Sequence, residues 1–143
     1  DLFHLLFITK IEPQLPSDAG VFIHSYPPSQ AALARINSDG WAERFEFYWQ
    51  GFEIANAFDE LTDPEEQKQR FLLDQQTRKT LGKTMVPMDF EFLQALERGL
   101  PPTGGIALGL ERLFMASQGI ARLQDLRWFS VREFIEEGWD SID

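Results

Sequence analysis

A glycine-rich run that ends in an acid–arginine pair is the segment of this chain best suited to chemistry. Residues 104–112 read Gly-Gly-Ile-Ala-Leu-Gly-Leu-Glu-Arg. Glycines have no Cβ, so a ligand can approach their backbone closely. An arginine at a strand-to-helix junction can donate forked hydrogen bonds to a phosphate. The same pattern is also typical of a glycine-rich strand packed under a helix, with Arg112 paired to an acid.

A second group of candidate residues lies in a predicted hairpin with its turn at Gln50 and Gly51. This turn places Glu46 and Glu53 on one sheet face as diagonal neighbours. Two carboxylates so close repel each other unless a cation lies between them. Mg²⁺ suits that position, because it binds one or two carboxylates together with substrate phosphates. The alternative is a pair of solvated acids on an open face.

Three further side chains alternate along the second strand of the hairpin: Asn56, Phe58 and Glu60. Alternation directs all three to one face. An amide, an aromatic ring and a carboxylate together can hold an ammonium group. The alternative is that Phe58 belongs to the core and the two polar residues mark a strand end. Glu53 and Asn56 are three positions apart, so a pocket lined by both requires a bulge or a strong twist.

The elements that position these residues are predicted from hydrophobic spacing, caps and turns. Ser29, Asp63 and Asp89 are the expected helix caps, and Pro64 with Glu66 completes a capping box after Asp63. Helices are expected over 2–11, 30–36, 64–81, 89–99 and 110–118. Strands are expected over 21–26, 44–49, 52–58 and 104–109. A short strand or turn and a short helix are expected over 123–143. This mixture predicts an α+β fold, an antiparallel sheet flanked by helices.

Composition excludes several classes of protein. A chain of 143 residues is one domain or part of one. It has no cysteine, which excludes disulfides and thiolate chemistry and fits a reducing cytoplasm. It has no apolar run of about 18 residues, so no membrane span is expected. The net charge of −10 argues against a general nucleic-acid surface. His4 and His24 are too few and too far apart for a histidine metal site.

Three segments together resemble a known family. They are FIHSYPPSQAALAR at 22–35, ERFEFYWQGFEIANAFDELTDPEEQ at 43–67 and PPTGGIALGLERLFM at 101–115. Their order and spacing resemble the C-terminal part of the class II lysyl-tRNA synthetase catalytic domain. Within that family, the resemblance is closest to the synthetase-like ligases that attach β-lysine to elongation factor P. The resemblance covers most of residues 1–130 and implies the same α+β architecture.

The resemblance also implies a role for each candidate residue. The run at 104–115 corresponds to class II motif 3, whose arginine, here Arg112, contacts the ATP γ-phosphate, and Gly109 belongs to the same ATP site. Glu46 and Glu53 correspond to carboxylates that bind Mg²⁺ and ATP. The residues implied for the pocket of lysine or β-lysine are Asn56, Phe58, Glu60, Gly105 and Ala107, and Glu60 is the expected partner of an ammonium group.

Ala107 helps to choose between branches of the family. Genuine lysyl-tRNA synthetases usually carry glycine at this position, and the β-lysine ligases resemble this chain in carrying alanine. A methyl group in the pocket floor changes the room for the amino acid and is worth at most a few kcal/mol of discrimination. The implied activity is therefore ATP-dependent formation of a lysyl or β-lysyl adenylate and transfer to a lysine of elongation factor P.

Two alternatives stay open, a lysyl-tRNA synthetase fragment that charges tRNA-Lys and a non-catalytic amino-acid-binding paralogue. Class II motif 1, which forms the dimer interface, and motif 2, which holds the α-phosphate, are absent from the chain. Residues 1–143 are therefore expected to be the C-terminal portion of a longer catalytic domain. The full-length protein is expected to be a cytoplasmic homodimer, and the chain alone is expected to be inactive.

Overall fold

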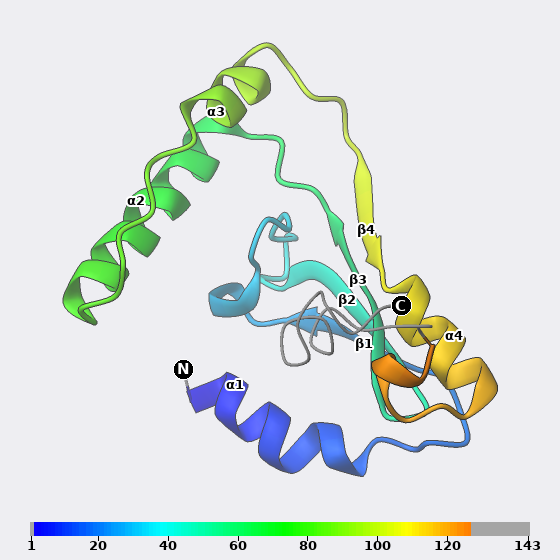
Figure 1. The fold of residues 1–143 in the computed structure, drawn as a ribbon. Coiled ribbons are helices and arrows are strands. Elements are labelled where there is room, and N and C mark those ends of the chain that lie inside the picture. Colours follow the sequence, from blue (N-terminus) through cyan, green and yellow to red (C-terminus); the bar gives the residue numbers. More distant parts are fainter. Residues whose placement is uncertain (1, 127–143) are drawn as a thin grey trace, which may run out of the picture. The chain divides into compact units, whose positions relative to one another are not determined.

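The computed structural model describes residues 2–126, and Figure 1 gives the order of its elements. Of the tail predicted over 123–143, only a 3₁₀ turn at Leu123–Leu126 is described. The rest of that prediction lies outside the described residues. None of the helices in residues 2–126 is both long enough and apolar enough to cross a membrane.

Four strands form one sheet in the order β1-β2-β3-β4. The strands are β1 at Val21–Tyr26, β2 at Ala42–Trp49, β3 at Phe52–Asp59 and β4 at Gly104–Leu108. Beside β4, the Gly109 N–H donates to the Ile54 carbonyl at 2.9 Å, and the Glu60 N–H donates to the Thr103 carbonyl at 2.9 Å. Residue numbers rise on β3 as they fall on β4, so this pair is antiparallel. The predicted α+β class, an antiparallel sheet with helices, is confirmed.

The same two hydrogen bonds test the prediction that a bulge or a strong twist lies between Glu53 and Asn56. They are six residues apart on each strand. The β3–β4 pairing therefore has no inserted residue between these bonds. If Glu53 and Asn56 line one pocket, the twist of β3 must bring them together rather than a bulge in this pairing.

The turn between β2 and β3 is the predicted two-residue turn. Gln50 has φ of 52° and Gly51 has φ of 76°. Positive φ at both central residues defines a type I′ turn, whose twist matches that of the flanking strands. This turn connects Trp49 directly to Phe52, which fixes the register of the strands that carry the acidic residues.

Helix α2 at Pro64–Thr80 begins as its caps predict. The Asp63 carboxylate accepts a hydrogen bond from the Glu66 N–H at 2.9 Å, and Pro64 is the first helical residue. The capping box also predicts that the Glu66 carboxylate reaches back to Asp63, but it accepts a hydrogen bond from the Arg70 guanidinium at 2.6 Å instead. Helix α2 ends before Gly82, whose φ is 63°.

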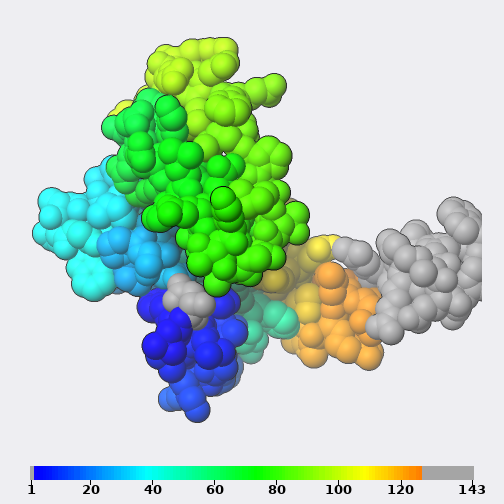
Figure 2. Space-filling model, turned by 90° about the vertical axis from the view of Figure 1, so that its left-hand side faces the viewer, coloured from blue at the N-terminus to red at the C-terminus, as the bar shows by residue number. Residues whose placement is uncertain are grey.

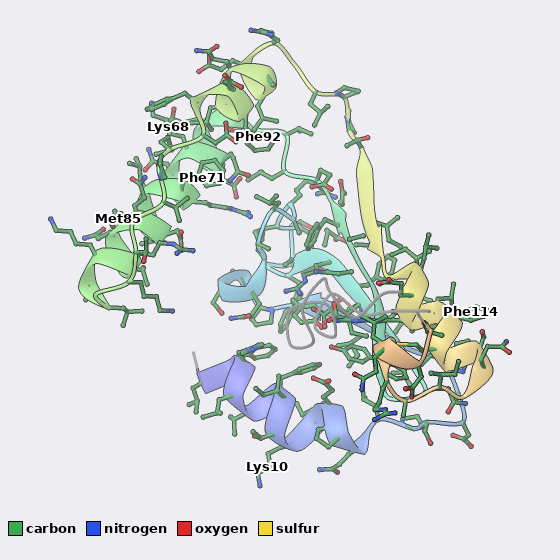
Figure 3. All side chains as sticks on the ribbon, viewed as in Figure 1. Lys10, Lys68, Phe71, Met85, Phe92 and Phe114 are labelled. Carbon is green, nitrogen blue, oxygen red and sulfur yellow. The ribbon has the colours of Figure 1, made fainter. Side chains whose placement is uncertain are left out.

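Helix α3 at Phe90–Glu97 is also capped as predicted, because the Asp89 carboxylate accepts from the Phe92 N–H at 2.9 Å. Helices α2 and α3 pack against each other (Figure 1). The rings of Phe71 and Phe92 come together between them, with centroids 6.2 Å apart (Figure 3). Part of α2 lies on the surface shown in Figure 2. In the same helix, 65% of Leu73 is accessible to solvent.

The prediction of a helix over residues 30–36, capped by Ser29, is wrong. Only a 3₁₀ turn at Pro28–Gln30 forms, and Ala32 has φ of 51°, which no helix tolerates. The following backbone pairs with the sheet instead, since the Arg35 N–H donates to the Asp59 carbonyl at 2.8 Å. From α2, the Arg70 guanidinium donates to the carbonyls of Ala32 and Ala34 at 3.1 and 2.8 Å. These long-range bonds replace the helical ones.

The predicted N-terminal helix is confirmed in extent, but its geometry changes along its length. Regular α-helix, α1, covers Leu2–Leu6, a π-helical turn covers Phe7–Ile11, and a 3₁₀ turn covers Glu12–Gln14. At the other end of the described chain, α4 occupies the predicted Leu110–Gln118 and ends at Gly119, whose φ is 67°.

The described residues divide into two compact units, each with its own buried residues. The first unit comprises 2–23, 46–56 and 107–126, and the second comprises 24–45 and 57–106. The buried hydrophobic residues of the first unit are Phe7, Tyr48, Ile54, Ala55, Met115 and Ala116, and those of the second are Tyr26, Ala31, Ala34, Ala42, Ala57, Leu61, Leu93 and Leu96. Each of the four described strands continues from one unit into the other, so both units contain candidate site residues.

Candidate active site

In the first unit, Arg112 lies in the first turn of α4 and points toward β3. Its Nη1 donates to the backbone carbonyl of Glu53 at 3.0 Å and lies 3.6 Å from the Glu53 Oε2. The Arg112 side chain is 56% exposed. A helix N-terminus favours negative charge, because its backbone N–H groups are unpaired and its dipole end is positive. A guanidinium fixed at this position adds to that preference, so the arrangement suits a phosphate.

Gly109 shapes this corner by leaving space for the arginine. An added Cβ at Gly109 would lie 3.4 Å from Cδ and 3.5 Å from Cβ of Arg112. The Gly109 N–H is bonded to the Ile54 carbonyl, so its backbone is held on β3. The aliphatic part of the Arg112 side chain therefore lies against Gly109, where another residue would have a Cβ.

The two predicted metal-binding carboxylates have different surroundings. Glu46 is only 7% exposed, and its Oε2 accepts a hydrogen bond from the Tyr48 hydroxyl at 2.8 Å. Tyr48 is buried too, with its ring 6.2 Å from the ring of Phe7. Glu53 is 37% exposed beside Arg112. The turn at 50–51 brings both acids onto adjacent strands, as predicted.

These residues fit Mg²⁺ only as part of a larger set of ligands. Residues 2–126 contain no group of three or more His, Asp or Glu side chains that could hold a metal ion by themselves. Glu46 and Glu53 offer two carboxylates, the number that Mg²⁺ takes from a protein when phosphate and water oxygens complete its octahedron. The donor chemistry therefore fits a metal that arrives with a phosphorylated substrate.

Two predicted pocket residues, Asn56 and Ala107, also belong to the first unit. Asn56 is half-buried on β3, between the buried residues Ala55 and Ala57. Ala107 is exposed on β4. An exposed alanine on a strand leaves only a methyl group between the backbone and a ligand, so Ala107 can influence the depth of a pocket there.

In the second unit, Phe58 lies beside an arginine that sequence reasoning missed. The Cζ of Arg44 lies 5.7 Å from the centroid of the Phe58 ring and 4.4 Å from that of the Tyr26 ring. Arg44 Nη1 donates to the Gln30 carbonyl at 2.9 Å. A cavity of about 460 Å³ opens next to Arg44 and Phe58. The only signal in the sequence was an arginine within a strand rich in aromatic residues, and this signal does not identify the rings that the guanidinium contacts.

Glu60 is the second predicted pocket residue of this unit. It is partly buried at the end of β3, where the chain pairs with Ala34. Burial, together with the negative charge of neighbouring Asp59, raises the pKa of the Glu60 carboxyl. Asp59 has its own cation, Arg35, whose Nε donates to it at 3.0 Å. Among residues 2–126, no side chain forms an ion pair or hydrogen bond with the Glu60 carboxylate.

Gly105 of β4 lies directly beneath Glu60. A Cβ built on Gly105 would overlap Oε1 of Glu60 and would lie 3.1 Å from its Cδ. The neighbouring Gly104 differs, since its added Cβ would meet only the Phe58 carbonyl oxygen, at 3.6 Å. The backbone of Gly105 thus faces the acid that is predicted to pair with an amino group.

Comparison with known proteins defines the class to which this fold and these side chains belong. Residues 6–133 match the family of class II tRNA synthetases for D, K and N, and the chain belongs to this family. Relatives named elongation factor P–(R)-β-lysine ligase occur in Proteus mirabilis, 46% identical over 132 residues, and in Hamiltonella defensa, 46% identical over 129. A third, from Histophilus somni, is 42% identical over 132 residues.

These alignments cover 91%, 89% and 91% of this chain and 41%, 40% and 41% of the respective relatives. The chain therefore spans about two fifths of the length of the curated relatives that it matches. The resemblance to the synthetase family, inferred from the three sequence segments, is confirmed. The roles of individual residues, which were carried over from that family, stay predictions.

Proposed function

We propose that this chain is the C-terminal part of a class II ligase that activates (R)-β-lysine with ATP and transfers it to a lysine of elongation factor P. The observation that carries this proposal is Glu60. It is a partly buried carboxylate with a raised pKa and with no cation paired to it among residues 2–126. A carboxylate in this state gains most from a ligand that brings a positive charge. The names of the relatives supply the candidate, an amino acid with two amino groups.

Five residues are proposed to take part in binding the amino acid, Asn56 and Ala107 in the first unit and Phe58, Glu60 and Gly105 in the second. Glu60 pairs with an ammonium group, Phe58 forms a cation–π wall and Asn56 offers an amide oxygen as acceptor. On β4, Gly105 lies against the Glu60 carboxylate, and Ala107 presents an exposed methyl group. The Ala107 methyl group leaves less room for the substrate than a glycine would. This difference supports a substrate whose amino group is placed differently from that of α-lysine.

The proposed ATP site uses the residues of the first unit. Arg112 binds the γ-phosphate, and Gly109 leaves room for the stem of Arg112 and for the nucleotide. Glu46 and Glu53 would hold Mg²⁺. When bound, the metal neutralises phosphate charge as pyrophosphate departs. The first unit therefore supplies charge complementarity rather than a nucleophile.

The proposed reaction has two steps, and neither forms a covalent bond to the protein. First, a carboxylate oxygen of the amino acid attacks the α-phosphorus of ATP, which gives an aminoacyl-adenylate and releases pyrophosphate. Next, the uncharged amine of the acceptor lysine attacks the acyl carbon, the bond from the acyl carbon to AMP breaks, and the nitrogen releases one proton to water as the amide forms and AMP leaves. Positioning and electrostatic stabilisation account for catalysis of this kind.

A second candidate acceptor is tRNA-Lys, because the family that the chain matches consists of tRNA synthetases. The chemistry of activation is the same, and only the group that attacks the adenylate differs. Transfer to elongation factor P is favoured, because the three relatives compared above are 42–46% identical to this chain and are all named elongation factor P–(R)-β-lysine ligase. A homodimer and a cytoplasmic location belong to the same proposal.

The test uses the full-length protein. Pyrophosphate exchange is measured with (R)-β-lysine and with α-lysine, and transfer is measured with elongation factor P and with tRNA-Lys. We expect exchange to prefer β-lysine and transfer to go to elongation factor P, and a factor whose acceptor lysine is replaced by arginine should receive nothing. Charging of tRNA-Lys would favour the second candidate. Amino-acid binding without exchange would identify a non-catalytic paralogue.

A further inference from the structure

The contact between Gly105 and Glu60 has an unusual shape. The carboxylate of Glu60 lies over the α-carbon of Gly105, in the volume that any other residue would fill with its Cβ. Real Cβ atoms are not found so close to an oxygen. The space above Gly105 is thus already taken by a side chain of the protein, so a ligand does not approach this glycine through that volume.

The backbone on both sides of this contact is fixed. The Glu60 N–H donates to the Thr103 carbonyl at 2.9 Å, and the Leu61 N–H donates to the Leu33 carbonyl at 2.8 Å. Glu60 also forms a β-bridge with Ala34. The backbone of the glutamate cannot move away without breaking pairing on two sides, and the glycine cannot move away without breaking the pairing of β4 with β3. A clash at residue 105 must therefore be relieved by the Glu60 side chain.

That side chain can move at low cost. The overlapping atom is the far end of a flexible side chain, and the nearest atoms after it are the Glu60 Cδ at 3.1 Å and Cγ at 3.6 Å. Rotation of the terminal torsions would remove the overlap without disturbing the sheet. A methyl group at residue 105 should therefore leave the fold intact but displace the carboxylate by roughly 1 Å, a shift large enough to change function.

We propose that Gly105 is a positioning residue whose missing side chain seats the Glu60 carboxylate and thereby determines the affinity for the amino group of the substrate. The proposal deepens the function given above and rests on it. Gly105 acts through Glu60 and need not touch the substrate. The β3–β4 pairing then contributes to the specificity for a cationic amino acid, because it places Gly105 against the Glu60 carboxylate.

The matched substitutions are Gly105→Ala and Gly104→Ala in the full-length protein. Both add one methyl group to β4, but the methyl group at 104 meets only a carbonyl oxygen at an ordinary distance of 3.6 Å. We expect Gly105→Ala to raise the KM for β-lysine about 100-fold in pyrophosphate exchange, as for a misplacement of about 1 Å, with the KM for ATP unchanged. Gly104→Ala should raise the KM for β-lysine far less than Gly105→Ala does. Equal losses in both variants would overturn the proposal.

A double-mutant cycle tests whether Gly105 acts through Glu60. Glu60→Ala removes the carboxylate, so a methyl group at residue 105 then has nothing to displace. We expect Gly105→Ala to cause no further loss in that background. Additive losses would show that Gly105 contacts the substrate itself and would refute a positioning role.

A readout without substrate separates this proposal from the proposed function. Carboxyl NMR with ¹³C-labelled glutamate follows the titration of Glu60 in wild type and in both glycine variants. We expect the Glu60 midpoint to shift in Gly105→Ala and to stay at the wild-type value in Gly104→Ala. An unchanged midpoint in Gly105→Ala overturns the seating of Glu60. A shifted midpoint in a protein without exchange activity would contradict only the proposed function.

Discussion

Arg112 donates its hydrogen bond to the backbone carbonyl of Glu53, at 3.0 Å, and its Nη1 lies farther, at 3.6 Å, from the carboxylate of the same residue. The guanidinium is thus held by the strand itself. A metal ion or a substrate can engage the Glu53 side chain without releasing Arg112. The cation at the start of α4 and the acid on β3 are for this reason able to act on the same phosphorylated ligand.

Arg112→Ala should lower adenylate formation by about 100- to 1000-fold, as expected when one preorganised donor to a developing charge is removed. The measurement is pyrophosphate exchange in the full-length protein. Arg78→Ala is the control, because the Arg78 guanidinium pairs with Asp74 within α2, at 2.7 Å. Exchange at the wild-type rate in Arg112→Ala would refute the assigned role.

Glu53→Gln should raise the Mg²⁺ concentration needed for half-maximal exchange by about tenfold or more, because the ion loses one charged ligand. The backbone carbonyl that holds Arg112 is unchanged in this variant. Thermal stability should therefore stay close to that of wild type. Glu97→Gln, at an exposed position on α3, is the control. An unchanged Mg²⁺ requirement would remove Glu53 from the metal site.

Glu60→Gln should stabilise the ligand-free protein and weaken its binding of the amino acid. The pKa of Glu60 is raised in the folded state, so ionisation of this carboxyl is less favourable there than in the unfolded chain. As the pH rises from the ordinary pKa of about 4.3 through the raised value, the folded state holds more protons and the free energy of unfolding falls. A neutral glutamine does not incur this loss.

The melting temperature of Glu60→Gln should thus exceed that of wild type at pH 7 to 8, and the difference should vanish below about pH 4, where both forms are neutral. Calorimetry from pH 3.5 to 8 measures this difference. In the same variant, the KM for the amino acid should rise and the KM for ATP should not. A variant that is less stable at pH 7 would contradict the unpaired state of Glu60.

Arg44→Met should destabilise the protein by about 1–2 kcal/mol, because the guanidinium lies 4.4 Å from the Tyr26 ring and donates to the Gln30 carbonyl. Urea unfolding measures this difference, with Arg78→Met as the matched control, because the Arg78 guanidinium pairs with Asp74 on the same helix. Arg44→Lys should recover only part of the loss, since an ammonium group lacks the flat stacking surface of arginine. No loss in Arg44→Met would show that the cation–π contact contributes nothing to stability.

Ala107→Gly should shift the ratio of kcat/KM between β-lysine and α-lysine toward α-lysine by about tenfold, the range for one methyl group in a pocket. Competitive exchange assays with both amino acids measure this ratio. Ala95→Gly, at an exposed position on α3, should lower stability without changing the ratio. A constant ratio in Ala107→Gly would exclude Ala107 from substrate selection.

The parts of the fold that the sequence predicts are those fixed by neighbouring residues. Asp63 and Asp89 cap their helices through an N–H three positions away, and the turn at 50–51 needs only local backbone geometry. The family resemblance adds predicted roles for the candidate site residues, and these roles stay predictions. Caps and turns each depend on only a few consecutive residues, so residue type and spacing are enough to predict them.

The missed features depend on partners that are far away in sequence. Residues 30–36 fail to form a helix because the Arg35 N–H bonds to Asp59, 24 residues later. The stacking of Arg44 on Tyr26 joins two strands, and the seat of Glu60 on Gly105 needs the β3–β4 register. No local propensity contains this pairing information, so it could not be predicted from residue type and spacing.

Gln50 has a left-handed backbone conformation, with φ of 52°, so a substitution at this position can stabilise the chain. A side chain with a Cβ incurs a penalty of about 1–2 kcal/mol in that conformation, which glycine avoids and asparagine reduces. Gln50→Gly or Gln50→Asn would therefore stabilise the turn, and residue 50 is not one of the residues proposed to bind the amino acid. Laboratory evolution toward new amino acids could begin from such a stabilised parent, which would tolerate more destabilising changes in the pocket than the present chain does.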